Sequence, residues 1–172
     1  MGGGEVVTLQ VGQCGNQVGC RFWDLILREH VLHNRVGMFN QALSAYFTDA
    51  DARCGASSQD ARALRARAVL VDMEEGVVAA ALRGPLRTLF DRRQIVTNVS
   101  GSGNNWAHGH EVYGPVHRDV LVEAVRRAAG SCDSLQCFSV VHSLGGGTGS
   151  GLGTYLLRAV KDELPGPHRF VT

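Results

Sequence analysis

A glycine-rich segment at residues 145–151 holds the groups best suited to binding an anion. It has the sequence GGGTGSG, so five of its seven residues are glycines. Glycine lets the backbone approach a phosphate closely, and N–H groups at a helix start point toward such an anion. The hydroxyl groups of Thr148 and Ser150, and of Ser143 just upstream, can add hydrogen bonds. The predicted phosphate contacts in this part of the chain are Ser143, Gly145, Gly146, Gly147, Thr148 and Gly149.

Two familiar phosphate-binding motifs do not account for this segment. A Walker A loop has a lysine directly after its glycines, and none stands there. No window of the chain fits G-x-G-x-x-G, which disfavours a dinucleotide-dependent oxidoreductase. The remaining alternative is a tight structural turn. Because each glycine costs about 0.5–1 kcal/mol in a regular element, so many glycines favour phosphate binding.

A second turn, GQCGNQ at residues 12–17, stands at the start of another predicted helix. Its N–H groups and side-chain amides suit phosphates on the other flank of a ligand. Gln13 and Cys14 are the predicted contacts. The alternative is that Gln13 or Asn16 only caps the helix.

Two carboxylates, Asp72 and Glu74, follow the second predicted strand. There they can hold Mg²⁺ through its water shell beside the phosphates. The alternative is a capping box in which Asp72 is the N-cap and Glu75 stands three residues later. Both interpretations are compatible if Asp72 caps the helix and Glu74 faces the metal.

A third polar segment, GSGNN at residues 101–105, follows the third predicted strand. Asn104 and Asn105 are predicted to reach phosphate or ribose through their side-chain amides. The alternative is a turn that requires a positive φ, which asparagine tolerates. Trp106 is predicted to pack against protein rather than to stack on a ligand, and His142 to be a hydrogen-bonded core residue rather than a general base.

Alternating strands and helices must position these segments. Strands are predicted at 5–11, 68–71, 94–99 and 135–141, and helices at 14–30, 74–82, 116–129 and 152–164. This order predicts an α/β fold with a doubly wound, mostly parallel sheet and helices on both faces, similar to a Rossmann fold. Ligands of such sheets bind outside the carboxyl ends of the strands, which is where the polar and glycine-rich segments fall.

Periodicity also predicts details of the packing. One face of the first helix is expected to present Val18, Phe22, Leu25 and Ile26. The third helix is expected to bury Val120, Leu121, Ala124, Val125 and Ala128. Residues 40–66 are expected to form a long surface excursion, and residues 169–172 a further strand with no helix after it.

Composition limits the class of protein. With 172 residues the chain fits one domain or part of one, and its net charge of +1 disfavours nucleic acid as the main partner. No apolar run reaches the length of a membrane span, and the first residues lack the pattern of a secretory signal. The five cysteines form no Cys-x-x-Cys pair and are predicted to be free thiols in a reducing cytoplasm.

The glycine-rich segments carry a family resemblance. Residues 145–151 match the signature of the tubulin family, and residues 12–17 resemble its N-terminal loop. Residues 72–74 and 103–110 (GNNWAHGH) resemble the family's intervening loops, so the similarity extends over nearly the whole chain apart from about 40–66.

Two further stretches resemble epsilon-tubulins rather than the alpha and beta chains of the microtubule wall. They are EGVV at residues 75–78 and, in the first helix, the residues from FWDL at 22–25 to REH at 28–30. The resemblance implies that residues 1–172 form the N-terminal part of a tubulin-like GTP-binding domain.

The resemblance also implies ligands, partners and location. It implies GTP or GDP with Mg²⁺, assembly with other tubulin subunits through the nucleotide face, and a role with centriolar proteins in the cytoskeleton at the centrosome and centriole. The family's phosphate contacts fall on Gln13, Cys14, Asn104, Ser143, Gly147, Thr148 and Gly149, with Glu74 on the magnesium side. The ribose and base contacts and the acidic residue that completes hydrolysis are expected beyond Thr172, so no turnover is expected of this chain alone.

Three other interpretations remain. The bacterial division GTPase shares the glycine loop, but the Cys-bearing N-terminal loop and the Asn-Asn-Trp element favour tubulin. A generic nucleotide-binding α/β domain and a truncated product without function are the other two.

Overall fold

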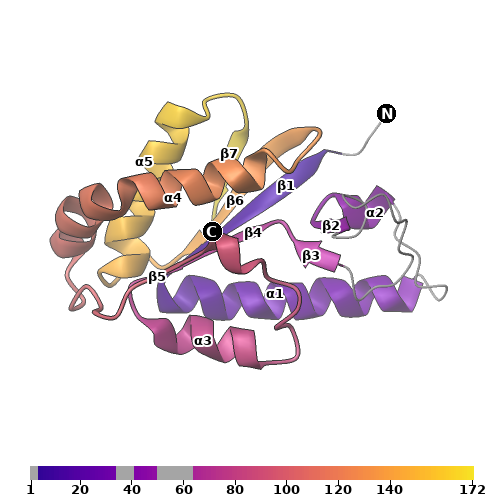
Figure 1. Cartoon of the computed structure of the whole chain (residues 1–172), viewed down its shortest axis with the longest axis horizontal. Helices are drawn as coiled ribbons and strands as arrows, with labels where there is room; N and C mark the ends of the chain where they lie inside the picture. The colour runs from indigo at the N-terminus through magenta and orange to yellow at the C-terminus, as the bar shows by residue number, and fades with distance from the viewer. Residues whose placement is uncertain (1–3, 34–40, 50–63) are drawn as a thin grey trace.

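Five parallel strands form the central sheet of the computed structural model, which describes residues 4–33, 41–49 and 64–172. The strand order is β5-β4-β1-β6-β7 (Figure 1). The strands are β1 (Glu5–Val11), β4 (Ala68–Asp72), β5 (Ile95–Thr97), β6 (Leu135–His142) and β7 (His168–Val171). Each neighbouring pair is parallel, which confirms the predicted α/β class.

Helices cover both faces of this sheet, as predicted for a doubly wound fold (Figure 1). The helices α1 (Gly12–His33) and α3 (Glu75–Arg83) pack on one face, and α4 (Gly114–Ala129) and α5 (Gly153–Glu163) on the other. Short helical turns complete the connections: η3 (Arg92–Gln94), η4 (His108–Tyr113) and η5 (Thr148–Leu152). Every residue of β4 is buried, as expected for a parallel strand covered on both sides.

The predicted surface excursion is partly wrong. The helix α2 (Gln41–Ser44) and the antiparallel strands β2 (Phe47–Asp49) and β3 (Leu64–Ala66) belong to it. Leu43, Phe47 and Leu64 are buried, and Phe47 packs its ring edge against Trp23 at 5.5 Å between centroids. The two ends of the segment are therefore part of the core, while residues 50–63 lie outside the described residues.

The predicted apolar face of α1 is half right: Phe22 and Ile26 pack against the core, whereas Val18 and Leu25 are exposed. The first half of the helix meets the sheet through small residues, and Trp23 in its second half is fully buried. A methyl group on Gly15 would overlap the carbonyl oxygen of Val141, and one on Gly19 would overlap the side chain of Gln10. Backbone contact brings α1 close to the sheet, so apolar spacing alone did not identify its buried side.

The α4 prediction holds with one exception. Leu121, Ala124, Val125 and Ala128 are buried, whereas Val120 is 57% exposed. The helix also starts two residues earlier than predicted, with a proline in its first turn. Proline suits the first turn of a helix because it has no N–H to leave unpaired and its fixed φ is helical.

A buried ion pair links the segments at the amino-terminal end of the sheet. Arg67 and Glu5 are both largely inaccessible to solvent and bind each other. The Arg67 guanidinium also donates to the carbonyl oxygens of Ser44 at 3.1 Å and Ser131 at 2.9 Å. This network joins β1 and the residue before β4 to the end of α2 and to the loop that precedes β6.

Two expectations from composition can be compared with the described part of the chain. No helix there has an apolar stretch long enough to cross a membrane. Cys14, Cys20, Cys132 and Cys137 are free thiols, as predicted, whereas Cys54 lies outside the described residues.

Gln10 is fully buried, and neither atom of its side-chain amide has a hydrogen-bond partner among the described residues. We expect Gln10→Met to raise the free energy of unfolding by about 1 kcal/mol, because an orphaned buried polar group costs roughly 1–3 kcal/mol and methionine has a similar volume. Chemical denaturation of both proteins measures the change. Gln136→Met, on an exposed residue of β6, is the control, and a clear loss of stability in Gln10→Met would contradict this account.

Candidate functional site

A pocket of about 610 Å³ lies where the loops after β1, β4, β5 and β6 converge. This volume is within the usual range for small-molecule sites, roughly 300–1,000 Å³. Its lining contains eleven of the predicted site residues and lacks Asn105 and Ser150. The eleven are Gln13, Cys14, Asp72, Glu74, Asn104, Ser143, Gly145, Gly146, Gly147, Thr148 and Gly149. The structure therefore brings together side chains that are as far apart in the sequence as residues 13 and 149.

The glycine loop leaves β6 and turns into η5 and α5. Gly146 has a φ of 87°, a conformation that favours glycine. The Gly147 carbonyl oxygen accepts hydrogen bonds from the N–H groups of Gly151 at 2.8 Å and Leu152 at 3.2 Å. The N–H groups of the first turn precede these and have no partner within the helix, so they are available to an anion.

The first loop lies directly against the glycine loop. Gly12 has a φ of 75°, and a methyl group there would be 2.7 Å from the backbone nitrogen of Gly149. Helix α1 starts at Gly12, so Gln13 and Cys14 stand in its first turn, where they are exposed to the pocket. Asn16 is buried instead and donates to the carbonyl oxygens of Gly12 at 2.9 Å and Val71 at 3.0 Å.

Three hydroxyl groups of the loop differ in their availability. Ser143 Oγ donates to the Gly145 carbonyl oxygen at 2.7 Å, and Thr148 Oγ1 lies 2.9 Å from Ser102 Oγ. Both Ser143 and Thr148 line the pocket. Ser150 does not: it is buried and bonds to the Gly146 carbonyl oxygen, so its predicted availability to a phosphate is wrong.

Both interpretations of Asn104, as a turn residue with a positive φ and as a side chain that faces the ligand site, agree with the structure. It is the only described residue other than glycine with a positive φ, at 58°, so the loop does contain the strained turn. Its side chain also lines the pocket, and a methyl group on Gly146 would be 3.2 Å from its Oδ1.

The capping box predicted for Asp72 and Glu75 is wrong. Helix α3 starts at Glu75, and its N-cap is Glu74, without a side-chain capping bond. Asp72 is 3% exposed, and its Oδ1 accepts a hydrogen bond from the Glu74 N–H at 3.3 Å. Burial raises the pKa of the Asp72 carboxyl, and the nearby negative charge of Glu74 raises it further. The two carboxylates therefore line the same pocket.

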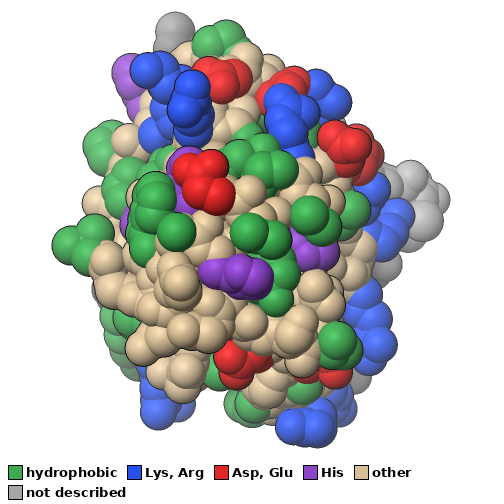
Figure 2. All heavy atoms as spheres, turned by 90° about the vertical axis from the view of Figure 1, so that its left-hand side faces the viewer, with side chains coloured by type: hydrophobic (Ala, Val, Ile, Leu, Met, Phe, Trp, Pro, Cys, Tyr) green, Lys and Arg blue, Asp and Glu red, His purple; other side chains and the backbone are tan. Residues whose placement is uncertain are grey.

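Positive side chains stay away from this pocket. Among the described residues that line it there is no lysine or arginine. Figure 2, which views the left-hand side of Figure 1, shows Lys and Arg side chains toward the margins and backbone, hydrophobic and His side chains in the centre. Within residues 4–33, 41–49 and 64–172, no group of three or more His, Cys, Asp or Glu side chains could hold a metal without other ligands.

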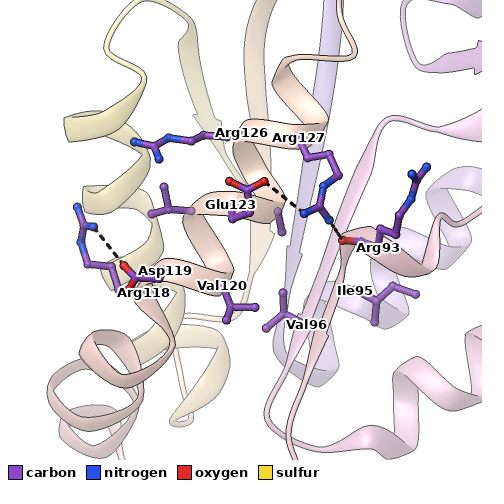
Figure 3. Close-up of a pocket in the computed structure, with 11 residues that line it drawn as sticks. Arg93, Ile95, Val96, Arg118, Asp119, Val120, Glu123, Arg126 and Arg127 are labelled. Carbon is purple, nitrogen blue, oxygen red and sulfur yellow. Dashed lines mark hydrogen bonds and ion pairs between the residues drawn. The ribbon is translucent and has the colours of Figure 1, made fainter.

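A second hollow, of about 500 Å³, lies between β5 and α4 and contains arginines (Figure 3). Arg127 donates to Glu123 at 3.3 Å and to the Arg93 carbonyl oxygen at 2.6 Å. Arg118 and Arg126 both pair with Glu163. These cations already have partners at the surface, so this hollow is not an anion site.

Comparison with known proteins agrees with this geometry. Residues 5–171 match the family described as "Tubulin/FtsZ family, GTPase domain". The chain belongs to the tubulin family. It is 55% identical to the tubulin epsilon chain of Mus musculus and 54% identical to that of Homo sapiens, in each case over 98% of this chain. Identity to the tubulin beta-1 chain of Colletotrichum graminicola is 45% over 94% of this chain. The chain spans 36% of the length of these curated relatives.

These matches confirm the resemblance to tubulins and, within them, to the epsilon chains. They also disfavour a dinucleotide-dependent oxidoreductase, because the fold and the family agree on a GTPase domain.

The structure agrees with both predictions made for rings near the pocket, Trp106 and His142. Trp106 stacks on His110 at 4.5 Å between ring centroids, so it packs against protein, although it is 46% exposed. His142 is buried, and its Nδ1 lies 2.9 Å from the Ser143 carbonyl oxygen, which confirms a hydrogen-bonded core histidine.

The pocket also contains residues that the sequence did not single out: Gln17, Gly76, Val77 and Ser102. Gln17 lies one helical turn after Gln13, so helical spacing could have identified it. Ser102 carries no such signal, because its contact with Thr148 joins loops 46 residues apart.

Proposed function

We propose that this pocket binds the phosphates of GTP or GDP together with Mg²⁺, as part of an epsilon-like tubulin. The observation that carries the proposal is the convergence of eleven predicted residues on one pocket. Backbone N–H groups of the glycine loop, the hydroxyl of Thr148, and the amides of Gln13 and Asn104 supply the donors that phosphate oxygens need. Ser143 would join them by turning its O–H from the Gly145 carbonyl oxygen to a phosphate.

The charge of the pocket explains why a metal is part of the proposal. Asp72 and Glu74 would repel a triphosphate, and no lysine or arginine of the described lining offsets that repulsion. A magnesium ion between carboxylates and phosphates would offset it. Mg²⁺ prefers oxygen ligands and keeps several of its waters, so two carboxylates beside a phosphate suit it.

Mg²⁺ dependence tests this arrangement. Chelation of Mg²⁺, or Glu74→Gln, is expected to weaken GTP binding by about 10–100-fold, the usual cost of losing an outer-sphere metal partner. Isothermal titration of the 172-residue chain measures the affinity. Glu75→Gln is the matched control, because Glu75 is exposed next to Glu74 but does not line the pocket. Equal GTP affinity with and without Mg²⁺ would argue against the metal.

Guanine selectivity rests on the family rather than on the described pocket. Among the pocket's described lining residues none is aromatic, so nothing there stacks on a base. We propose that selectivity is complete only in a longer chain. A fusion that continues this sequence with the rest of the mouse epsilon relative should prefer GTP to ATP, and equal affinity for both would count against a guanine nucleotide.

The surface around the pocket supports a protein partner. Leu144 is 92% exposed and Val99 84%, and Trp106 and Val112 are about half exposed. These side chains belong to the loops after β6 and β5 and to η4, which surround the pocket. We propose that another tubulin subunit covers this face. Cytoskeletal assembly with centriolar proteins at the centrosome is the corresponding cellular role, supported by the identity to epsilon chains.

A further inference from the structure

Ser102 connects two loops of the pocket. It is 5% exposed, although it lies in the loop between β5 and η4. Its hydroxyl oxygen lies 2.9 Å from that of Thr148. A methyl group on Gly147 would overlap the Ser102 side chain, so Ser102 also packs directly on the backbone of the glycine loop.

Which hydroxyl donates in the Ser102–Thr148 hydrogen bond decides whether Thr148 can donate to a phosphate oxygen. A threonine hydroxyl has a single proton to donate. If that proton points to Ser102, Thr148 can only accept, and it offers nothing to a phosphate oxygen. If Ser102 donates instead, the Thr148 proton is free, and the Thr148 oxygen is held in place as it donates to the anion.

We propose that Ser102 is a positioning residue of the phosphate site, with its O–H donating to Thr148 Oγ1 so that the Thr148 O–H faces the phosphates. This inference rests on the proposed function. The same contact holds the loop of Asn104 against the glycine loop, because Asn104 follows Ser102 by two residues and lines the same pocket. Ser102 therefore positions donors of both loops through its contact with Thr148.

Ser102→Ala removes the donor and leaves Thr148 in place. Because one neutral hydrogen bond contributes about 1 kcal/mol, we expect the Mg²⁺–GTP affinity of the 172-residue chain to fall roughly fivefold. Ser100→Ala is the control, since Ser100 lies in the same loop, contacts Tyr113 at 3.2 Å and does not line the pocket. Its GTP affinity should match that of the unmodified chain.

A double-mutant cycle separates positioning from a general effect on the fold. Ser102→Ala should cost nothing further in a Thr148→Ala background, because the group it positions is gone. In a Thr148→Ser background, which keeps the hydroxyl, it should again cost roughly fivefold. Isothermal titration with Mg²⁺–GTP measures the affinities of the six proteins: the unmodified chain, Thr148→Ala and Thr148→Ser, each with and without Ser102→Ala.

The outcomes distinguish the two proposals. Failure of the unmodified chain to bind Mg²⁺–GTP at all would overturn the proposed function. If the unmodified chain binds, equal affinity in Ser102→Ala would overturn the positioning role. So would a fivefold loss that persists in the Thr148→Ala background.

Discussion

Arg67→Met is expected to lower the free energy of unfolding by about 3–5 kcal/mol. The substitution leaves Glu5 buried without its counter-charge, and it removes the donors that bind the carbonyl oxygens of Ser44 and Ser131. The end of α2 and the loop that precedes β6 then lose their connection to Arg67 and, through it, to β1. Chemical denaturation followed by circular dichroism measures the loss.

An exposed ion pair provides the control for Arg67. Arg28 pairs with Asp24 one turn earlier on α1, and its side chain is mostly in solvent. Arg28→Met should cost no more than about 0.5 kcal/mol, since such surface pairs contribute little. A loss in Arg67→Met as small as in Arg28→Met would show that the buried network does not stabilise the fold.

Gly147→Ala is expected to damage both the fold and the phosphate site. The added methyl group would lie 2.8 Å from the Asn105 carbonyl oxygen and would overlap the Ser102 side chain. Such overpacking typically costs about 1–3 kcal/mol of stability. The loop must also shift away from the pocket, so Mg²⁺–GTP affinity should fall at least about tenfold, which corresponds to roughly 1.4 kcal/mol. Thermal unfolding and isothermal titration measure the two effects.

Gly145 is the matched control for Gly147. It lies in the same loop, but a methyl group there meets no protein atom within 4 Å. Gly145→Ala should therefore change stability by less than about 0.5 kcal/mol. Equal stability of the Gly147 and Gly145 variants would contradict the close contact between the glycine loop and residues 102–105.

The strands and the location of the pocket could be predicted from the sequence for a physical reason. Parallel strands covered on both faces are continuous apolar runs, and glycine or polar residues end each one at the same edge of the sheet. Asp72, Asn104 and Thr148 therefore converge although their order in the chain says nothing about distance.

The buried faces of the helices were harder to predict than the strands. Apolar periodicity identifies a buried face only where large apolar side chains make the contact with the sheet. Helix α1 meets the sheet through Gly15 and Gly19, so its exposed valine and leucine misled the prediction. Contacts between residues far apart in the sequence could not be predicted at all. Nothing local in the sequence indicates that Ser102 touches Thr148 or that Arg67 binds Glu5.

A phosphate series is the most direct test of the proposed site. GTP, GDP, GMP and guanosine are titrated into the 172-residue chain with Mg²⁺ by isothermal calorimetry. Because the described pocket offers donors for phosphates and no base-stacking side chain, affinity should fall with each phosphate removed, and guanosine should not bind. Guanosine binding as tightly as GTP would contradict the assignment of this pocket to the phosphates.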